Sequence, residues 1–508
     1  MTDSLMDSNG IESTAFSQTG LHAISAWLDA PPPLNTTDDL PPLLNHLASL
    51  RASRVTPEQR ASALERLYTR SISVLTTLLP ALSSVALPIP ITRKTRQLIR
   101  SLQTLLRTLA EDLLATQNSE DGNLIPDLRQ TPDLTLWRSL YALAQHLLIS
   151  NLAASPAGVG IWQQLHQTYA TALRLDLVNH TPEGASGSLQ NIYFSAILLA
   201  CAQPASFTSR EVDFVAAYLE RFADWIDSTP ITASKTSAAF WIDPARDSAA
   251  SACSRKPAPP DTSVLYFSCE RLSALLKKQL AALEAGDTPR QINLPDFAGT
   301  PAGRGVLRRL ITYWGEPSKR RFPRRRQNYR SVLCAGLDSL WRLFQGGDEA
   351  SIETSSWMIT NESPDGYAVM HVSGKTSGMT VGDVIAMRTE SGENWQICIV
   401  RWALSENQEH IELGLQILAT RAVPAFLALP AEASNSGRLS VLILPEIQAL
   451  RATEMLVVPS GALVNQSGKL ILVVEKANIE IREMKSTHLD EQNSQIEVYS
   501  IKPDSLPV

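Results

Sequence analysis

The stretch from Arg324 to Gly366 decides how this chain is interpreted. It opens with Arg324-Arg325-Arg326-Gln327-Asn328-Tyr329-Arg330 and closes with Asn361-Glu362-Ser363-Pro364-Asp365-Gly366. Arginine carries a planar, permanently charged fork that suits two-point contacts with phosphate oxygens or with the O6/N7 edge of guanine. The second run predicts a polar turn, where Asn361 and Ser363 can hydrogen-bond and Gly366 can adopt a positive φ. The apolar segment Ser331 to Gly336 is predicted to be the first strand of a β-domain.

These two runs resemble the motifs of the PilZ domain, the cyclic di-GMP receptor module of bacteria, over about residues 320–420. That family has an Arg-x-x-x-Arg motif before its first strand and an Asp/Asn-x-Ser-x-x-Gly motif at a later strand turn. Arg326 and Arg330 match the first motif, and Asn361, Ser363 and Gly366 match the second. The resemblance implies an antiparallel β-barrel that binds cyclic di-GMP, a ligand with two phosphates and two guanines. It implies ligand contacts from Arg325, Arg326, Arg330, Asn361, Ser363 and Gly366.

The register of the arginine motif has an alternative. Arg321 and Arg325 also stand four residues apart. Arg326 and Arg330 are preferred because Arg330 adjoins the predicted strand, and Arg325 is then a third contact.

The polar turn also has a simpler explanation. Asn361 and Ser363 can serve only the backbone of an Asx turn, without touching a ligand. Gly366 is expected to matter for geometry rather than for direct contact. The gap between the two motifs is long for the family, and residues Leu337 to Phe344 within it are predicted to form an inserted helical turn or two.

Length and composition limit the class of protein. A chain of 508 residues predicts two to four domains, and its apolar content of 44% is ordinary for a globular protein. A formal charge of −6 argues against a general nucleic-acid binder. Five scattered cysteines without C-x-x-C spacing indicate reduced thiols. No apolar run approaches the ~20 residues that span a bilayer, and the N-terminus does not resemble a secretion signal. We therefore expect a cytoplasmic protein with no membrane span.

Amphipathic patterns predict helices through the first half of the chain. Residues 1–36, which end in Pro31-Pro32-Pro33, are predicted to be a flexible leader. Two helix starts carry capping residues, in Thr56-Pro57-Glu58-Gln59 and Thr208-Ser209-Arg210-Glu211. From Arg93 onward leucines recur at three- and four-residue steps. Since no fixed repeat connects these helices, residues 37–290 are predicted to form an irregular helical bundle that contacts a partner or produces the output.

The pattern changes after residue 290. Residues 291–328 are predicted to be a basic linker, residues 329–420 a PilZ-like β-barrel, and residues 437–508 a C-terminal β-unit or an extension of that barrel. Alternation of apolar and polar residues from Ile411 to Ile417 indicates a half-buried strand. The predicted fold class is multidomain α + β: an N-terminal all-α irregular helical bundle, then an antiparallel PilZ-like β-barrel and a C-terminal β extension.

The sequence offers no catalytic or metal-binding pattern. It contains no nucleophile elbow, zinc motif or dinucleotide fingerprint. His371 and His410 have no partner at metal-ligand spacing. Arg401 can form a cation–π pair with the neighbouring Trp402, but it is interpreted as an ordinary strand surface residue. We therefore assign no catalytic residue, no metal and no cofactor, and we do not expect an enzyme.

Two functional hypotheses follow. The first is a non-catalytic cyclic di-GMP receptor, in which ligand binding orders the arginine linker and alters the packing or the protein partner of the helical domain. The alternative is a protein-interaction scaffold with a degenerate PilZ-like barrel, whose basic stretch binds an acidic partner or nucleic acid. The long gap between the motifs favours the alternative, whereas the acidic net charge makes nucleic acid the less expected partner. The sequence does not choose among motility, pili and surface polysaccharide as the output.

Overall fold

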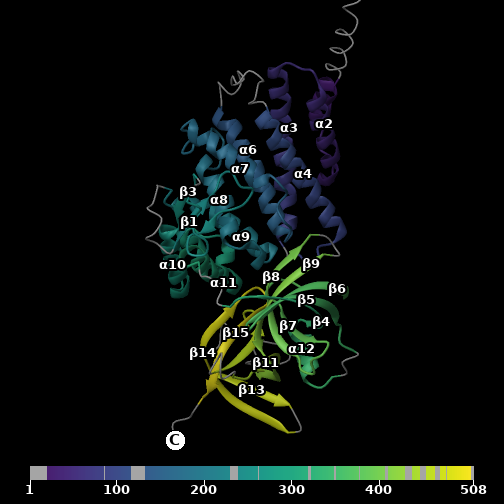
Figure 1. The fold of residues 1–508 in the computed structure, drawn as a ribbon, viewed down its shortest axis with the longest axis vertical. Helices are drawn as coiled ribbons and strands as arrows, with labels where there is room; N and C mark the ends of the chain where they lie inside the picture. Colours follow the sequence, from purple (N-terminus) through teal and green to yellow (C-terminus); the bar gives the residue numbers. More distant parts are fainter. Residues whose placement is uncertain are drawn as a thin grey trace, which may run out of the picture.

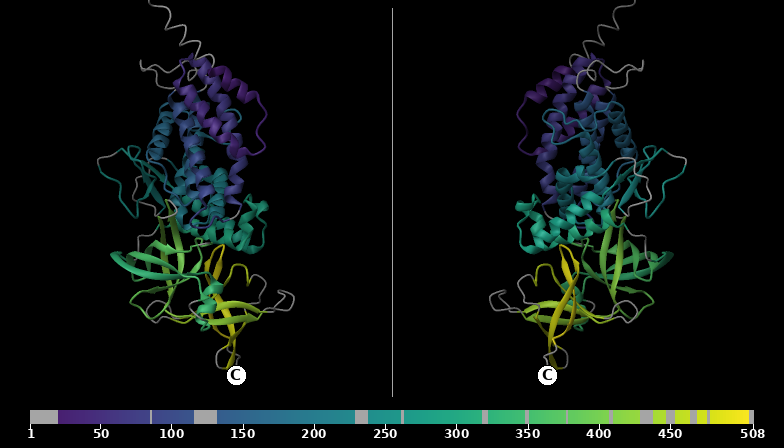
Figure 2. Two further views of the ribbon diagram at one scale, coloured as in Figure 1. Left: turned by 90° about the vertical axis from the view of Figure 1, so that its right-hand side faces the viewer. Right: turned by 90° about the vertical axis from the view of Figure 1, so that its left-hand side faces the viewer.

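A computed structural model shows how the predicted parts are arranged. It describes residues 20–84, 86–115, 132–228, 238–260, 263–317, 322–347, 351–376, 378–406, 410–428, 438–446, 453–463, 469–475 and 478–504. Helices form one end of the molecule and two β-barrels form the other (Figures 1 and 2). The predicted fold class is confirmed, because a helical region is followed by antiparallel barrels.

The helical region is built on one hydrophobic core that extends in the sequence from Ile24 to Trp314. After a first helix at residues 20–29, its α-helices are α2 (Leu40–Ala52), α3 (Pro57–Ser83), α4 (Arg93–Ala115), α6 (Pro132–Leu152), α7 (Ile161–Arg174), α8 (Leu189–Cys201), α9 (Ser209–Phe222), α10 (Glu270–Ala285) and α11 (Pro301–Leu310). Short helical turns are η1 (Thr36–Asp39), η2 (Pro204–Ser206), η3 (Ala223–Trp225), η4 (Pro289–Ile292), η5 (Asp296–Gly299) and η6 (Ile311–Gly315). A small sheet of order β2-β1-β3 lies beside them, with β1 (Ala239–Ile242), β2 (Ser251–Ala252) and β3 (Leu265–Ser268).

Both predicted helix starts are confirmed by their capping geometry. Thr56 and Gln59 form a reciprocal capping box at the start of α3, and Thr208 and Glu211 form another at the start of α9. Each box satisfies backbone N–H groups that the first helical turn leaves without partners. These local bonds explain why the two boundaries follow from the sequence alone.

The prediction of a flexible leader over residues 1–36 is wrong for its second half. Residues 20–29 are helical, and Ile24 in that helix is only 2% exposed. Leu21 and Leu28 pack against the same core, so an apolar stripe at three- and four-residue spacing anchors the segment. Residues 1–19 lie outside the described part of the chain.

The first barrel is closed by six strands in the order β4-β5-β6-β9-β8-β7. They are β4 (Arg325–Ala335), β5 (Ser355–Ser363), β6 (Gly366–Gly374), β7 (Val384–Thr389), β8 (Gln396–Ser405) and β9 (Ile411–Ala419). The inserted helix predicted between the motifs is confirmed as α12 (Leu337–Phe344). Its buried Leu340 and Leu343 pack between residues of both barrels.

The first strand begins earlier than predicted. β4 starts at Arg325, so residues 325–328, predicted to belong to the linker, are already part of the strand, and Arg325 and Arg326 are paired with β5. The polar character of Arg325 to Asn328 concealed this, because a strand end that is exposed to solvent needs no apolar alternation.

The C-terminal β region is a complete second barrel rather than an extension of the first. Its order is β10-β11-β12-β15-β14-β13, with strands β10 (Val423–Ala428), β11 (Arg438–Leu444), β12 (Glu454–Pro459), β13 (Lys469–Glu475), β14 (Ile479–Gln492) and β15 (Ile496–Pro503). It begins at Val423, before the predicted boundary at 437, because β10 closes the barrel by pairing with β11 and β13. Counted within each barrel, both have the strand order first, second, third, sixth, fifth, fourth.

Within the described ranges, the helices do not combine length and apolar character to the extent that a membrane-spanning helix requires.

Candidate ligand site

The arginine strand and the polar turn meet on neighbouring strands of the first barrel. In the antiparallel pairing of β4 with β5, Arg326 lies opposite Asn361 and Arg325 lies opposite Glu362. Arg330 lies further along, opposite Met358. Residues that face each other in such a pair place their side chains on the same face of the sheet. The structure therefore brings Arg326 and Asn361 together, but not Arg330 and Asn361.

Between the two arginines of the predicted motif, β4 turns other side chains toward the barrel. Tyr329 packs against the barrel core, and its hydroxyl donates to Glu362 Oε2 at 3.2 Å. Gln327 Nε2 donates to the same oxygen at 3.0 Å. Burial and the neighbouring Glu362 carboxylate raise the pKa of Tyr329 to about 12. Arg326 and Arg330, in contrast, are exposed.

The turn between β5 and β6 is held by its own polar groups. The Ser363 hydroxyl lies 2.7 Å from Asp365 Oδ1 and 3.1 Å from the Gly366 carbonyl oxygen, either of which can accept its proton. The Ile417 backbone N–H donates to the Asp365 carbonyl oxygen at 2.9 Å, which ties the turn to β9. Ser363 therefore has hydrogen-bond partners within its own turn, and its side chain is half-buried.

Gly366 is required by a close approach of two strands. A Cβ atom at this position would lie 2.0 Å from the backbone oxygen of Leu415 on β9. The expectation of a positive φ is wrong, because Gly366 is not among the glycines with positive φ. Its requirement is still geometric, since only glycine lets β6 and β9 pair so closely here.

A pocket of about 540 Å³ opens beside this turn, between the helical region and the first barrel. The helical region lines it through η2 and η6, and the segment that leads into β4 lines it through Phe322 and Arg324. The barrel contributes the turn, β8 and β9. The complete lining is Gln203, Ala205, Ser206, Tyr313, Phe322, Arg324, Ser363, Asp365, Gly366, Tyr367, Arg401, Trp402, Gly414, Leu415 and Gln416.

Two arginines bring positive charge to the pocket, beside the one carboxyl group in its lining, that of Asp365. Arg324 comes from the segment before β4, and Arg401 comes from β8. Arg401 Nε donates to Gln416 Oε1 at 2.5 Å, and another nitrogen of its guanidinium lies 2.6 Å from Glu491 Oε2 on β14. These two partners fix the guanidinium plane, so Arg401 links the pocket to the second barrel.

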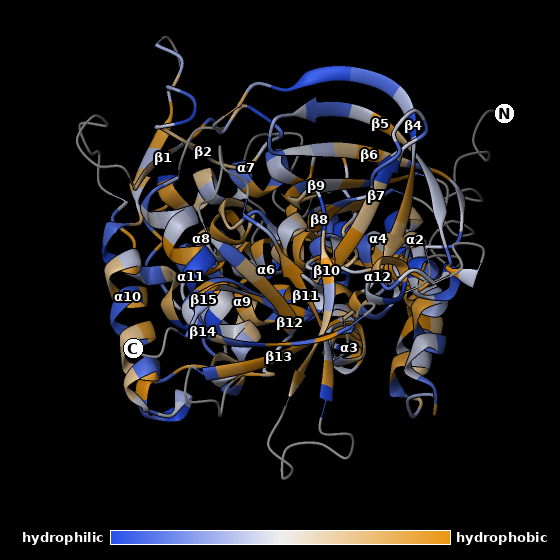
Figure 3. Ribbon diagram, turned by 90° about the horizontal axis from the view of Figure 1, so that it is seen from below, coloured by the Kyte–Doolittle hydropathy of each residue, from blue (hydrophilic) through white to orange (hydrophobic). Residues whose placement is uncertain are grey.

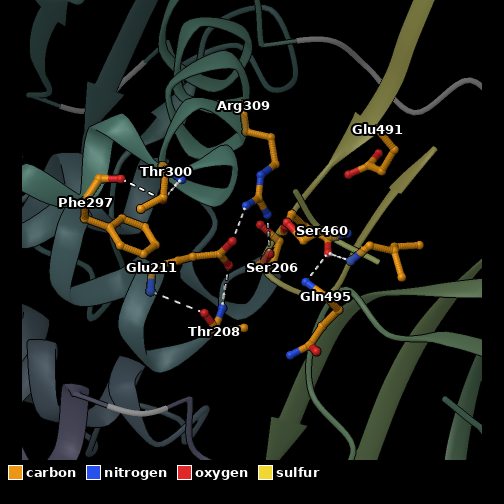
Figure 4. A network of polar contacts seen from close by, with 12 residues as sticks. Ser206, Thr208, Glu211, Phe297, Thr300, Arg309, Ser460, Glu491 and Gln495 are labelled. Atoms are coloured by element: carbon orange, nitrogen blue, oxygen red, sulfur yellow. Dashed lines mark hydrogen bonds and ion pairs between the residues drawn. The ribbon is translucent and has the colours of Figure 1, made fainter. Parts of the chain in front are cut away.

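A polar network adjoins the pocket where the helical region meets the barrels (Figure 4). The Arg309 guanidinium of α11 donates to Glu211 Oε1 at 2.9 Å and to the Ser206 carbonyl oxygen at 2.8 Å. Glu211 is only 1% exposed, and its carboxylate also accepts from the Thr208 N–H at the start of α9. Both partners of the ion pair are therefore held by a further hydrogen bond. Since Ser206 lines the pocket, this network holds one of its walls in place.

The structure sorts the predicted ligand contacts into two groups. Ser363 and Gly366 line the pocket, whereas Arg325, Arg326, Arg330 and Asn361 are not among its lining residues. Arg324 does line it. Arg320 and Arg324 also stand four residues apart in the sequence. Arg320 and Arg321 lie outside the described residues.

Arg401 is the other residue that the sequence analysis missed. It was interpreted as an ordinary strand surface residue, but it lies in the pocket and bridges the two barrels. Nothing in its local sequence distinguishes it from other exposed strand residues, because the pocket wall and Glu491 reach it only through the tertiary fold.

Comparison with known proteins gives two family matches. Residues 22–231 match the model of the cyclic-di-GMP receptor FimW N-terminal domain. Residues 341–424 match the model of the cyclic-di-GMP receptor FimW middle PilZ domain, a range that includes the polar turn and Arg401 but not β4. The cyclic-di-GMP receptor FimW of Pseudomonas aeruginosa is 21% identical to this chain over 447 residues, covering 72% of each protein.

Proposed function

From the premise that this chain carries a PilZ domain, as its two motifs predicted, we propose that it is a non-catalytic cyclic di-GMP receptor. Residues 22–231 of its helical region also match the model of the FimW N-terminal domain. The observation that carries the proposal is one pocket that holds Arg324, Arg401 and the Ser363–Gly366 turn together. The description of the Pseudomonas aeruginosa relative as a cyclic-di-GMP receptor supports it.

The chemistry of the pocket fits such a ligand. Arg324 and Arg401 offer guanidinium groups to the two phosphates or to guanine edges. Tyr313, Phe322 and Trp402 offer aromatic faces, on which bases stack with little dependence on sequence. The volume of about 540 Å³ lies within the ~300–1,000 Å³ typical of small-molecule sites. Ser363 and Gln416 add polar groups that can orient a base.

The remaining predicted contacts take a secondary place in this proposal. Arg326 and Asn361 lie opposite each other at the end of the β4–β5 ladder. Arg325 and Arg330 are exposed on the same strand. We assign these four residues to the rim of the site, where their charge attracts the anionic ligand but makes weaker contacts than Arg324. The arginine segment before β4 would become ordered around the bound ligand.

Occupancy of this pocket would alter how the two halves of the protein pack. Its walls come from η2 and η6 on one side and from the first barrel on the other. A ligand that contacts both walls favours the arrangement in which they are correctly spaced, by as much as its affinity differs between arrangements. In this proposal the helical region passes that change to a protein partner. The location would be the cytoplasm, which fits five cysteines that are all free thiols.

Calorimetric titration with cyclic di-GMP tests the proposal. We expect binding by the unaltered protein and about a tenfold or greater loss for Arg324→Ala, since a two-point arginine contact with guanine is worth ~1–3 kcal/mol. Arg326→Ala should weaken the binding of cyclic di-GMP less than Arg324→Ala does. Arg421→Ala is the matched control, because Arg421 is an exposed arginine two residues before β10, the first strand of the other barrel.

Two results would overturn the proposal. Absence of binding by the unaltered protein would exclude the receptor, and retention on a nucleic-acid column with steep salt dependence would then favour the scaffold alternative. Equal affinity in Arg324→Ala and Arg421→Ala would exclude the pocket as the site.

Hydrogen exchange tests the change in packing separately. The Ser405 backbone N–H on β8 donates to the Ala154 carbonyl oxygen of the helical region at 2.8 Å. Addition of cyclic di-GMP should change the exchange rate of the peptide that contains Ser405. Binding without any change in that exchange rate would agree with the receptor function but would contradict a change in packing between the two halves.

A further inference from the structure

The tip of the β14–β15 hairpin, residues 491–496, lies where the second barrel meets the other two parts of the molecule. Figures 1 and 3 both show these strands beside α11. On the side of the helical region, Arg308 of α11 donates to Gln492 Oε1 at 2.6 Å. On the side of the first barrel, Gln495 Nε2 donates to Thr380 Oγ1 at 2.8 Å. The tip therefore contacts both of the parts that form the walls of the ligand pocket.

Glu491 in this tip holds one of the two arginines of the pocket. Arg401 Nη1 donates to Glu491 Oε2 at 2.6 Å, while Arg401 Nε donates to Gln416. A guanidinium group binds a phosphate with the same fork that binds a carboxylate. Glu491 thus takes a place on Arg401 that also suits an anionic ligand. A phosphate on the same guanidinium would repel the Glu491 carboxylate, since both are negative.

A second set of donors lies beside the Glu491 carboxylate. Glu491, Arg309 and Asn493 line one cavity of about 30 Å³. Within the described part of the chain, Arg309 Nε and Asn493 Nδ2 are buried without a hydrogen-bond partner, which costs stability. Asn493 Oδ1 accepts from the backbone N–H groups of Gln495 and Ile496, so the amide is fixed with Nδ2 on its other side. The cavity has room for a carboxylate oxygen, because a water molecule needs ~10–15 Å³ of such space.

We propose that Glu491 changes partner when the pocket is occupied, an inference that rests on the proposed function of the pocket. An anionic group of the ligand takes Arg401, and the Glu491 carboxylate moves to Arg309 Nε and Asn493 Nδ2. Figure 4 shows the Glu491 side chain on β14 directed toward the network around Arg309 of α11. The second barrel thereby exchanges a bond to the first barrel for a bond to the helical region. One side chain communicates occupancy of the pocket to the third part of the molecule.

Charge explains why Arg401 is the first partner. Glu211 lines the same cavity and already binds Arg309 at 2.9 Å. Because Glu211 is buried and negative, a second carboxylate beside it is unfavourable. The other bond of Arg401 goes to Gln416, which is neutral. A ligand phosphate on Arg401 removes this advantage, so the carboxylate then favours the cavity.

Substitution of Arg401 tests the movement without any ligand. Arg401→Met removes the first partner, so Glu491 should move into the cavity and bind the Asn493 amide. Because that amide accepts from the N–H groups of Gln495 and Ile496, hydrogen exchange at these two positions should slow by about threefold or more. Unchanged or faster exchange would overturn the proposal. Faster exchange is the result of simple loosening of the tip, and unchanged exchange is expected if a water molecule satisfies the two donors.

Two further variants of the full chain identify the cause of the slower exchange. Arg438→Met is the matched control, because Arg438 also binds a carboxylate of the second barrel, that of Glu475 at 3.0 Å, and lines neither the pocket nor the cavity. It should leave exchange at the tip unchanged. Arg401→Met/Glu491→Ala should exchange within about twofold of the unaltered protein, since no carboxylate remains to move. Slow exchange in that double variant would exclude Glu491 as the cause and overturn the proposal.

Cyclic di-GMP provides an independent measurement. At saturation it should slow exchange at Gln495 and Ile496 in the unaltered protein by about the same factor as Arg401→Met. Glu491→Ala should still bind the ligand but show no slowing at the tip. Binding without slowing in the unaltered protein would overturn only this inference. Absence of binding would overturn the receptor function and, with it, the ligand as the cause of the movement.

Discussion

The two barrels share one strand order and differ in what surrounds it. In the first barrel, the second and third strands are joined by Pro364 and Asp365 alone, and this tight turn carries Ser363 and Gly366 to the pocket. In the second barrel, the corresponding strands β11 and β12 are joined by residues 445–453. Arg321 and Arg324 are among the four residues before β4, whereas Arg421 is the only arginine among the four residues before β10.

The difference shows that the barrel is a frame and that the pocket depends on the segments attached to it. Identical topology gives both barrels a core of inward-facing apolar residues. Among the residues that the structure describes, only those of the first barrel bring a polar turn, an arginine segment and a helical wall to one pocket. A similar fold is therefore no reason to place a second ligand site on the second barrel.

The largest expected effect comes from the glycine that shapes the turn. Gly366→Ala would place a Cβ atom 2.0 Å from the Leu415 backbone oxygen, and it should lower the free energy of unfolding by about 3 kcal/mol. Binding of cyclic di-GMP should be lost with it. The counterpart in the second barrel is Glu454, the first residue of β12, and Glu454→Ala should change stability by less than about 1 kcal/mol. Urea unfolding of both variants measures this, and equal losses would remove the distinction between the barrels.

A smaller effect comes from a carboxyl group in the first barrel. Burial raises the pKa of Asp383 to about 6, against hydrogen bonds from Thr380 that lower it. Since the folded pKa is above the unfolded one, the stability that this group contributes is complete below pH ~4 and is lost as the pH rises through about 6.

The loss should amount to about 1–2 kcal/mol after allowance for partial solvent screening. Asp383→Asn cannot ionise and should flatten the stability profile over that pH range. Thermal unfolding of both proteins at several pH values checks this. Parallel profiles for the two proteins would show that Asp383 does not cause the slope.

The smallest effect concerns the ion pair that connects the barrels. Glu491→Gln removes a negative charge 2.6 Å from the Arg401 guanidinium while keeping a hydrogen-bond acceptor. The pocket becomes more positive, and affinity for a doubly anionic ligand should rise about threefold. Glu475→Gln is the matched control, because Glu475 of β13 pairs with Arg438 of β11 and neither residue lines the pocket. Calorimetry of both variants measures this. Weaker binding by Glu491→Gln would contradict the expected effect of the Glu491 charge on ligand affinity.

Features that depend on neighbouring residues were predictable. The capping boxes at Thr56 and Thr208, the inserted helix at residues 337–344 and the turn at Ser363 were all found from short stretches. The helical first half and the β-rich second half followed from the change in apolar period. In each case the deciding interactions lie within a few residues along the chain, so the sequence contains them directly.

Features that depend on distant pairing were not predictable. The start of β4 at Arg325 and of the second barrel at Val423 are set by ladders to strands far along the chain. Strand register and barrel closure are decided by such long-range contacts, which local patterns specify weakly.

The sequence by itself therefore determined the class of fold, the PilZ resemblance and the polar turn. The tertiary structure alone placed Arg324, Arg401 and Tyr313 around one pocket, because those residues come from a connecting segment, a barrel strand and a helical turn that meet only after folding. It also decided which isoleucines stay exposed, since alternation along β14 cannot tell which face of a hairpin a barrel will bury.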